Sequence, residues 1–458
     1  MALKRLFGVA VALASAVLLV RAPDASATSL RDAVATAVQN NPQILEAAAN
    51  RRAVDEELNQ ARGLYLPRLD LEANAGFAYF NRPGSSINHD SRWGDQIGLV
   101  ARHTLFDGGF RNAEVEKQSA RVGGAARRVR ERSELIALET LQSYLDVNRF
   151  NGILKLSDDN LNAIRDLLAL VRTRFSGGSS TQGEVHLAQE RVFSAEAVRT
   201  DVRRTLGSAE ARYQNLVGKK PSALQSVGPP RGVPASRDSA LSLARSRNPT
   251  LAAAERDVQA ARADLTQSEA AFRPTIALEG RTSAGHDLNG VPGPTQDASA
   301  KLVMSWNLFN GHIDQARRRE RGERLGEIEA RRDRLRRDVD EAVMRAWSDI
   351  KATDERVVII DRQIDSGKAL IAAYRQEFEA GRRSMLDLLE AQNVYFNARV
   401  QRLTAGFLAS FARYQLLAAG GGLLAHFNLG PVDDADEDLR AWNRDRHDRP
   451  SLHPLLRR

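Results

Sequence analysis

The sequence Glu379-Ala-Gly-Arg-Arg-Ser-Met-Leu-Asp-Leu-Leu-Glu-Ala-Gln-Asn-Val-Tyr-Phe-Asn-Ala398 places a tight glycine turn between two long helical patterns that contain no proline. Two acidic residues, Asp387 and Glu390, follow the turn within the second helical pattern. A turn between two such patterns predicts the tip of a helical hairpin. This arrangement is more typical of the end of an elongated structure than of a catalytic pocket.

A second copy of this stretch lies 203 residues earlier, at Phe175-Ser-Gly-Gly-Ser-Ser-Thr-Gln-Gly-Glu-Val-His-Leu-Ala-Gln-Glu-Arg-Val-Phe193. Apolar residues before each turn recur every seven positions, which predicts a coiled coil. At 1.5 Å per residue, a helix from Phe110 to Phe175 would be about 100 Å long. The two heptad lines correspond at the same offset, so we interpret the chain as an internal duplication. These lines are Val147, Leu154, Leu161, Leu168 and Phe175, and Ile350, Val357, Ile364, Ile371 and Phe378.

The hydrophobic period changes from 3.6 to 2 after Pro67 and again after Pro274. Each of these segments contains two runs in which apolar and polar residues alternate, separated by a polar loop. The runs have roughly a dozen residues, a length suited to tilted strands that span a membrane. An ordinary soluble sheet with one wet face is the alternative interpretation of the same alternation.

These patterns divide the chain into four parts. Lys4 and Arg5, an apolar run and Ala25-Ser-Ala27 predict a signal peptide at 1–27. We expect a first repeat at 28–234, with strands at about 67–80 and 94–106 and a hairpin at about 110–217. We expect a second repeat at 235–430, with strands at about 274–286 and 297–309 and a hairpin at about 312–420. Residues 431–458 are polar, and we expect a disordered tail there.

Composition excludes several classes of protein. A charged fraction of 27% and a mean hydropathy of −0.40 exclude a membrane protein with many helical spans. The absence of cysteine excludes disulfides, thiolate metal sites and a lipid anchor on cysteine. The pI near 9.9 could indicate nucleic acid as a partner, but the arginines are scattered among glutamates, which indicates solvated helix faces. We therefore expect no nucleic-acid partner.

Four amphipathic strands cannot cross a bilayer alone, because an open sheet leaves its edge groups unsatisfied in lipid. The chain must therefore combine its strands with those of other copies. Two copies give eight strands and three give twelve, and the wider ring leaves room for a lumen. The apolar residues would face lipid, and the long helices would continue the ring. The polar residues expected to face the lumen are Asp70, Glu72, Asn74, Gln96, Arg102, Glu279, Arg281, Lys301 and Asn307.

The chain resembles the TolC family of outer-membrane efflux and secretion channels over nearly its whole length. The motifs that carry the resemblance occur in the same order in both repeats. They are Asn41-Pro42 and Asn248-Pro249, Pro67 and Pro274, Leu105-Phe-Asp-Gly108 and Leu308-Phe-Asn-Gly311, and the hairpin pattern that runs from Phe378 to Gln392.

The resemblance implies an α+β membrane protein: a trimeric, twelve-stranded β-barrel, with four strands from each chain, that continues into a long α-helical coiled-coil barrel. It implies a place in the bacterial outer membrane, in contact with lipid, with the helical barrel in the periplasm. It also implies partners, namely a periplasmic adaptor protein and an inner-membrane ABC transporter or proton-driven pump.

The resemblance also assigns residues at the hairpin tip. The family's entrance acids fall on Asp387 and Glu390, and a trimer would carry three of each, a ring that favours cations. The family's gate arginine falls on Arg383. Its gate tyrosine falls on Phe378, which has no hydroxyl to donate. In the first repeat Glu184 keeps the acid, whereas Ser180 and Leu187 replace Arg383 and Glu390. Asp387 and Glu390 could also be ordinary acids of a first helical turn, which the helix dipole favours.

No enzymatic arrangement competes with this interpretation. The sequence has no nucleophile motif or phosphate loop, and its eight histidines lack metal-ligand spacing. We therefore expect no enzyme, cofactor or metal, and we expect His89 and His286, in or beside the outer loops, to be solvated.

We predict a passive outer-membrane channel in a tripartite export system, and we favour type I protein secretion because of Leu308-Phe-Asn-Gly311 and Gly420-Gly-Gly-Leu-Leu424. One alternative is a channel for small molecules or drugs with a proton-driven pump. Another, of a different class, is a soluble periplasmic coiled-coil adaptor.

Overall fold

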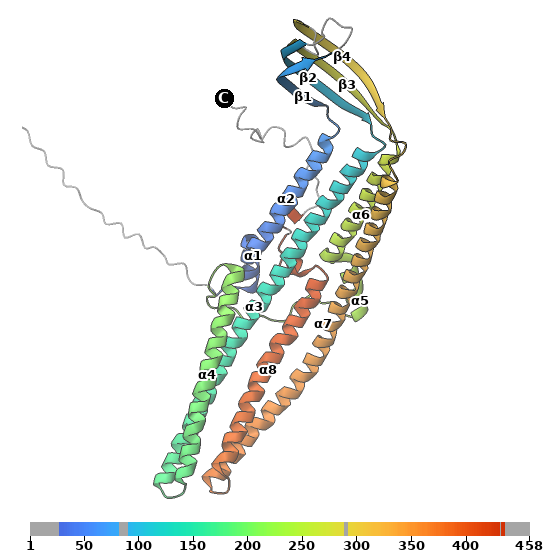
Figure 1. Ribbon diagram of the computed structural model, residues 1–458. Helices are drawn as coiled ribbons and strands as arrows, with labels where there is room; N and C mark the ends of the chain where they lie inside the picture. The colour runs from blue at the N-terminus through green and yellow to red at the C-terminus, as the bar shows by residue number, and fades with distance from the viewer. Residues whose placement is uncertain (1–26, 82–89, 288–291, 431, 436–458) are drawn as a thin grey trace, which may run out of the picture.

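The computed structural model describes residues 27–81, 90–287, 292–430 and 432–435. The chain is elongated, with a four-stranded sheet at one end and two helical hairpin tips at the other (Figure 1). All but the last residue of the predicted signal peptide and nearly all of the predicted tail lie outside the described residues. Among the described residues, no helix combines the length and the apolar character needed to cross a membrane.

The two repeats contain the same elements in the same order. The first consists of α1 (Leu30–Asn40), α2 (Pro42–Gly63), β1 (Arg68–Phe80), β2 (Asp90–Phe106), α3 (Phe110–Ser176) and α4 (Gln182–Val217). The second consists of α5 (Arg237–Arg247), α6 (Pro249–Glu269), the 3-10 turn η1 (Ala270–Phe272), β3 (Thr275–His286), β4 (Pro294–Ser305), α7 (Ile313–Glu379) and α8 (Met385–Ala419). Two short elements, α9 (Leu423–His426) and the 3-10 turn η3 (Asp433–Ala435), follow α8.

Asparagine-proline pairs separate the short helices in both repeats. Asn41 and Asn248 have extended backbone, as residues before proline do, and their side chains accept hydrogen bonds from the first amides of α2 and α6. Each side chain also donates to the end of its own return helix: Asn41 Nδ2 to the Leu216 carbonyl at 3.3 Å and Asn248 Nδ2 to the Ala419 carbonyl at 2.9 Å. The motif therefore anchors each hairpin to the short helices of its repeat.

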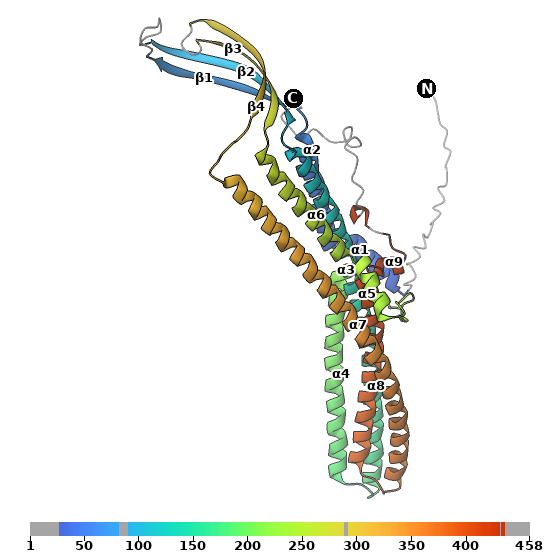
Figure 2. The ribbon, with the colours of Figure 1, turned by 90° about the vertical axis from the view of Figure 1, so that its right-hand side faces the viewer.

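The long helices α3 and α7 each have 67 residues, so each is about 100 Å long. They run from the sheet to the tips, and α4 and α8 return alongside them (Figure 2). The main core lies midway, where α1, α3, α4 and α8 meet α9, and Tyr144 and Tyr213 are fully buried there. The Tyr144 hydroxyl donates to the carbonyl of Thr28 or Gln225, at 2.8 and 2.9 Å, which ties the start of the described chain to the linker between the repeats.

The four strands form one antiparallel sheet in the order β1-β2-β3-β4. Hydrogen-bonded neighbours therefore come from both repeats, with β2 beside β3. Strands β1 and β4 are the edges, and each is paired on one side only within the described chain.

The structure corrects two strand boundaries. Strand β2 begins at Asp90 rather than at 94, because β1 continues to Phe80 and pairs with the added residues. Strand β4 spans Pro294–Ser305 rather than about 297–309. The reason is that β3 begins at Thr275, which pairs with Ser305, so the residues after Ser305 have no strand residue of β3 beside them. Asn307, predicted as a lumen-facing strand residue, therefore lies beyond the sheet.

The predicted disordered tail is wrong for residues 432–435. These residues form a turn against α2 and α3, where Asp434 is 9% exposed. Its carboxylate lies 2.6 Å from the Arg52 guanidinium and 3.7 Å from that of Arg51. A buried charge is retained only when it is paired, and these two arginines supply the pairing.

Candidate functional site

The two hairpin tips lie side by side at the end of the molecule away from the sheet (Figures 1 and 2). The helices are joined by five-residue turns at 177–181 and 380–384, and Gly178 and Gly381 both have φ of +75°. A residue with a Cβ is strained in that left-handed conformation, so glycine fits both turns. Thr181 and Ser384 then cap the return helices α4 and α8.

Asp387 and Glu390 lie on α8 just after the turn, as the helical spacing predicted. The Ser384 hydroxyl donates to Asp387 Oδ2 at 2.8 Å, and the Asp387 amide donates to Ser384 Oγ at 3.2 Å. Asp387 is therefore held by its own helix cap, and Glu390 is exposed three residues further along. Asp387 lies in the first turn of α8, where the positive end of the helix dipole stabilises negative charge, and Glu390 lies in the second turn.

Arg383, in the 380–384 turn, has its charged partners on the two helices of its own hairpin. Its guanidinium lies 2.8 Å from the Glu377 carboxylate and 3.8 Å from that of Asp387, and it stacks 4.2 Å from the centre of the Tyr374 ring. The hydrogen bond that Arg383 donates to the Glu377 carboxylate is the main cause that raises the pKa of Arg383 above its usual range. The loop therefore carries a fixed cation directly beside Asp387.

Phe378 is buried rather than exposed at the entrance. It is 2% exposed, in a core cluster with residues of both hairpins such as Val171 and Met385. The Arg174 guanidinium carbon lies 4.8 Å from the centre of its ring. Phe378 thus packs the two tips together, a role that needs no hydroxyl group.

Glu184 forms a capping box at the start of α4. Its carboxylate accepts hydrogen bonds from the Ser180 hydroxyl and, at 3.3 Å, from the Thr181 amide. The Met385 amide on the other hairpin lies near enough to contribute to lowering the pKa of Glu184. The hydrogen bond from Ser180 is the largest cause that lowers the pKa of Glu184. The structure thus places Glu184 near the start of α8 and packs Phe378 against the first hairpin, whereas Arg383 is paired within its own hairpin.

Arg174 and Glu377 were not identified from the sequence. Arg174 immediately precedes Phe175, and Glu377 occupies the corresponding position of the second repeat. One signal in the sequence could have identified them: Arg174 and Glu377 occupy equivalent positions of the two repeats and carry opposite charges.

The sheet has two chemically different faces. The cross-strand register places Leu71, Leu99 and Leu278 on one face, together with the other alternating apolar residues. The polar residues share the opposite face, where Arg281 on β3 reaches across β2 to Glu72 on β1 at 3.2 Å. Eight of the nine residues expected to share a polar face do so, as the register shows: Asp70, Glu72, Asn74, Gln96, Arg102, Glu279, Arg281 and Lys301.

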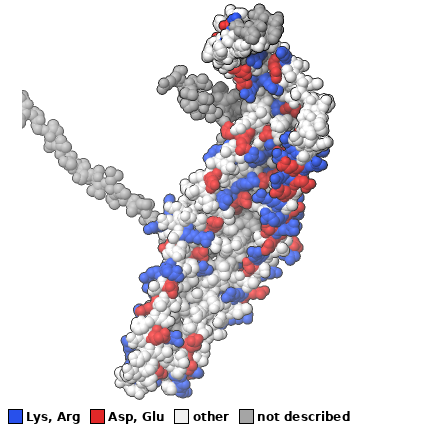
Figure 3. Space-filling view, viewed as in Figure 1, with Lys and Arg blue, Asp and Glu red and all other residues white. Residues whose placement is uncertain are grey.

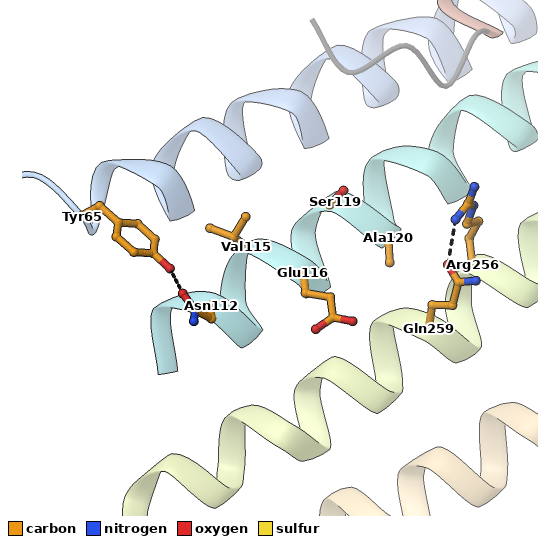
Figure 4. Close-up of a pocket in the computed structure, with 8 residues that line it drawn as sticks. All are labelled: Tyr65, Asn112, Val115, Glu116, Ser119, Ala120, Arg256 and Gln259. Carbon is orange, nitrogen blue, oxygen red and sulfur yellow. Dashed lines mark hydrogen bonds between the residues drawn. The ribbon is translucent and has the colours of Figure 1, made fainter. Parts of the chain in front are cut away.

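Charges elsewhere are interspersed. Basic and acidic side chains alternate over the helices on the face shown in Figure 3. A small hollow where α2 ends beside α3 and α6 is drawn in Figure 4, with the Tyr65 hydroxyl pointing toward Asn112 and Arg256 donating to Gln259 at 2.8 Å. Four of its polar side chains are thus hydrogen-bonded in two pairs, so it is less promising as a functional site than the tips.

Comparison with known proteins gives a consistent result. The family described as "Outer membrane efflux protein" matches residues 33–219 and 240–422. The outer membrane efflux protein BepC of Brucella suis is 26% identical over 93% of this chain and 91% of its own. The alkaline protease secretion protein AprF of Pseudomonas aeruginosa is 25% identical over 93% and 90%. The structure of the outer membrane protein VceC of Vibrio cholerae is similar, with a TM-score of 0.73 and 18% identity over 88% of this chain and 97% of that one.

Proposed function

Because this chain belongs to the outer membrane efflux protein family, we propose that three copies of it form a passive duct from the periplasm to the exterior. Three predictions are confirmed: the resemblance to TolC channels, the α+β fold with internal duplication, and the location in the outer membrane with the helical barrel in the periplasm. Family membership also supports a channel rather than an enzyme, and it argues against a soluble adaptor.

The observation that best supports the duct is the sheet, which has one apolar and one polar face and two edge strands that are paired on one side only. Its apolar face suits lipid and its polar face suits water, but β1 and β4 each need another strand. Strands from further copies would satisfy these edges. An eight-stranded barrel is filled by its own side chains, whereas twelve strands leave a lumen, which favours three copies over two.

The helices support the same assembly. Helix α3 contacts α1 and α2 of its own repeat and α6 of the other repeat. Its counterpart α7 contacts α5 and α6 of its own repeat, but within the described chain α2 of the other repeat does not pack beside it. Further along α7, toward the tip, Val358 and Ile359 are 52% and 64% exposed. By the repeat symmetry, the missing neighbour of α7 is α2 of another copy. Such head-to-tail contacts form a closed ring when the rotation from copy to copy completes a full turn.

Within this function, we propose that Asp387 and Glu390 form acidic rings at the periplasmic entrance, and that Arg383, Phe378 and Glu184 position them. We also propose that residues 1–27 are the export signal, that 28–234 and 235–430 are the two repeats, and that a periplasmic adaptor and an inner-membrane pump complete the system.

For the cargo, we propose protein secretion through an ABC transporter. The relative AprF, whose name describes protease secretion, supports this choice, together with the motifs Leu308-Phe-Asn-Gly311 and Gly420-Gly-Gly-Leu-Leu424. The description of the matching family, which names efflux, supports small-molecule efflux as the second candidate.

A deletion strain separates the two candidates. Loss of one or more proteins from the culture medium, with unchanged drug sensitivity, is expected for protein secretion. An unchanged set of secreted proteins with increased drug sensitivity would reject it in favour of efflux.

A further inference from the structure

Arg174, in the last turn of α3, reaches across to the other hairpin. Its Nη1 donates to the Phe378 carbonyl at 2.7 Å and to the Glu379 carbonyl at 2.8 Å, and its Nη2 donates to the Ser179 carbonyl of its own turn at 3.2 Å. Phe378 and Glu379 are the last two residues of α7. Carbonyls at the end of a helix lack partners within that helix and carry the negative end of its dipole. Arg174 therefore caps α7 with a positive charge supplied by α3.

Glu184 places the opposite charge, a negative one, at the start of the next helix, α8. Its carboxylate lies near the amide of Met385, the first residue of α8, and this amide contributes to lowering the pKa of Glu184. An anion at the start of a helix complements the positive end of the helix dipole. The first hairpin thus supplies a cation to the end of α7 and an anion to the start of α8, one on each side of the 380–384 turn.

The second hairpin does not return these contacts. Its counterpart of Arg174 is Glu377, which pairs with Arg383 of the same hairpin. The contact is therefore one-sided: the Arg174 side chain of the first tip binds backbone carbonyls of the second. Backbone recognition of this kind holds the position of the second turn whatever side chains it presents to the entrance.

We infer that Arg174 is a positioning residue that holds the α7–α8 tip, with Asp387 and Glu390, against the α3–α4 tip of the same chain. Independent movement of the second tip then requires the Arg174 contacts to break. The role of this movement at the entrance depends on the proposed channel function, but the contact itself does not.

Hydrogen exchange measured by mass spectrometry on the full-length assembled protein tests the contact. We expect Arg174→Gln to make peptides covering residues 376–390 exchange about tenfold faster, because losing hydrogen bonds to a charged group raises the open population by at least that factor. Arg174→Lys keeps the charge but loses the forked geometry, so an intermediate increase is expected. Arg172→Gln is the matched control, because Arg172 is exposed and only two residues away.

Exchange in Arg174→Gln that stays within twofold of the wild type would overturn the inference, as would an equal increase in the Arg172→Gln control. If Arg174→Gln does not assemble, the comparison of Arg174→Lys with Arg172→Gln decides in the same way. Conductance in a planar bilayer is recorded on the same samples. Faster exchange in a protein that never conducts would leave the contact standing and reject the channel, whereas conductance with unchanged exchange would reject the contact alone.

Discussion

Phe378 and Phe175 occupy equivalent positions of the two repeats, yet Phe378 is 2% exposed and Phe175 is 45% exposed. The difference arises because Phe378 lies between the two tips, under the Arg174 guanidinium, whereas Phe175 lies outside this cluster. The tips of one chain therefore share a single small core that is built around the second repeat.

Truncation of these two residues is expected to have unequal effects. Phe378→Ala should reduce the free energy of unfolding of the tip by about 3 kcal/mol, because it removes a fully buried aromatic side chain and leaves a cavity. Phe175→Ala should reduce it by less than about 1 kcal/mol, because its side chain is half exposed. Hydrogen exchange of the tip amides measures both. Equal effects of the two substitutions would contradict the packing described above.

The burial of the Glu134 carboxyl group leads us to expect that the stability of the protein depends on pH. Its side chain is buried in α3, and its carboxylate accepts a hydrogen bond from the Leu423 amide at 3.1 Å. Burial is the main cause that raises its pKa to about 7 from an ordinary value of 4.5. Between these two pKa values the folded chain holds a proton that the unfolded chain releases. Stability is therefore highest below the lower pKa and falls as the pH rises toward 7, by about 3 kcal/mol in total.

Thermal or denaturant unfolding between pH 5 and pH 8 measures this dependence. Glu134→Gln is expected to remove that part of the pH dependence, because the amide cannot ionise. Glu196→Gln, on an exposed carboxylate paired with Arg165, is the control and should leave the pH profile unchanged. A Glu134→Gln profile that follows the wild type would show that Glu134 is not the group responsible.

The pair of Glu72 and Arg281 tests the polar face of the sheet. The Arg281 guanidinium now lies 3.2 Å from the Glu72 carboxylate. Arg281→Glu would replace it with a second carboxylate that faces Glu72. Both side chains are about half exposed, so we expect a loss of only about 0.5–1 kcal/mol per chain. The double exchange Glu72→Arg with Arg281→Glu should restore the melting temperature of the assembly. No recovery in the double variant would mean that the two side chains do not interact across β2.

Much of the fold could be predicted from local patterns, because the alternation in β1 and the heptads of α3 are imposed by one buried or lipid-facing side of each element. The turns were predictable because Gly178 and Gly381 stand where the backbone requires positive φ. The limits of β4 were not, because they depend on where its neighbour β3 begins.

The site was predictable only in part for the same reason. Asp387 and Glu390 follow from helical spacing, whereas the contacts of Arg174 depend on how two hairpins about 200 residues apart in sequence meet. The burial of Phe378 likewise depends on the first hairpin. Glu377 could have drawn attention as the partner of Arg383, six residues away, but the bend of the turn that brings them together is not visible in the spacing.

The reversal potential of the purified protein in a planar bilayer under a salt gradient tests the proposed channel most directly. We predict stepwise conductance with a reversal potential that indicates preference for cations, because rings of acidic side chains favour them. Asp387→Ala with Glu390→Ala should move the reversal potential toward zero, and Asp201→Ala, on an exposed acid of α4, should not. A bilayer that contains the inserted protein yet stays as resistive as bare lipid would contradict the channel, and an unchanged reversal potential in the double variant would contradict the acidic entrance.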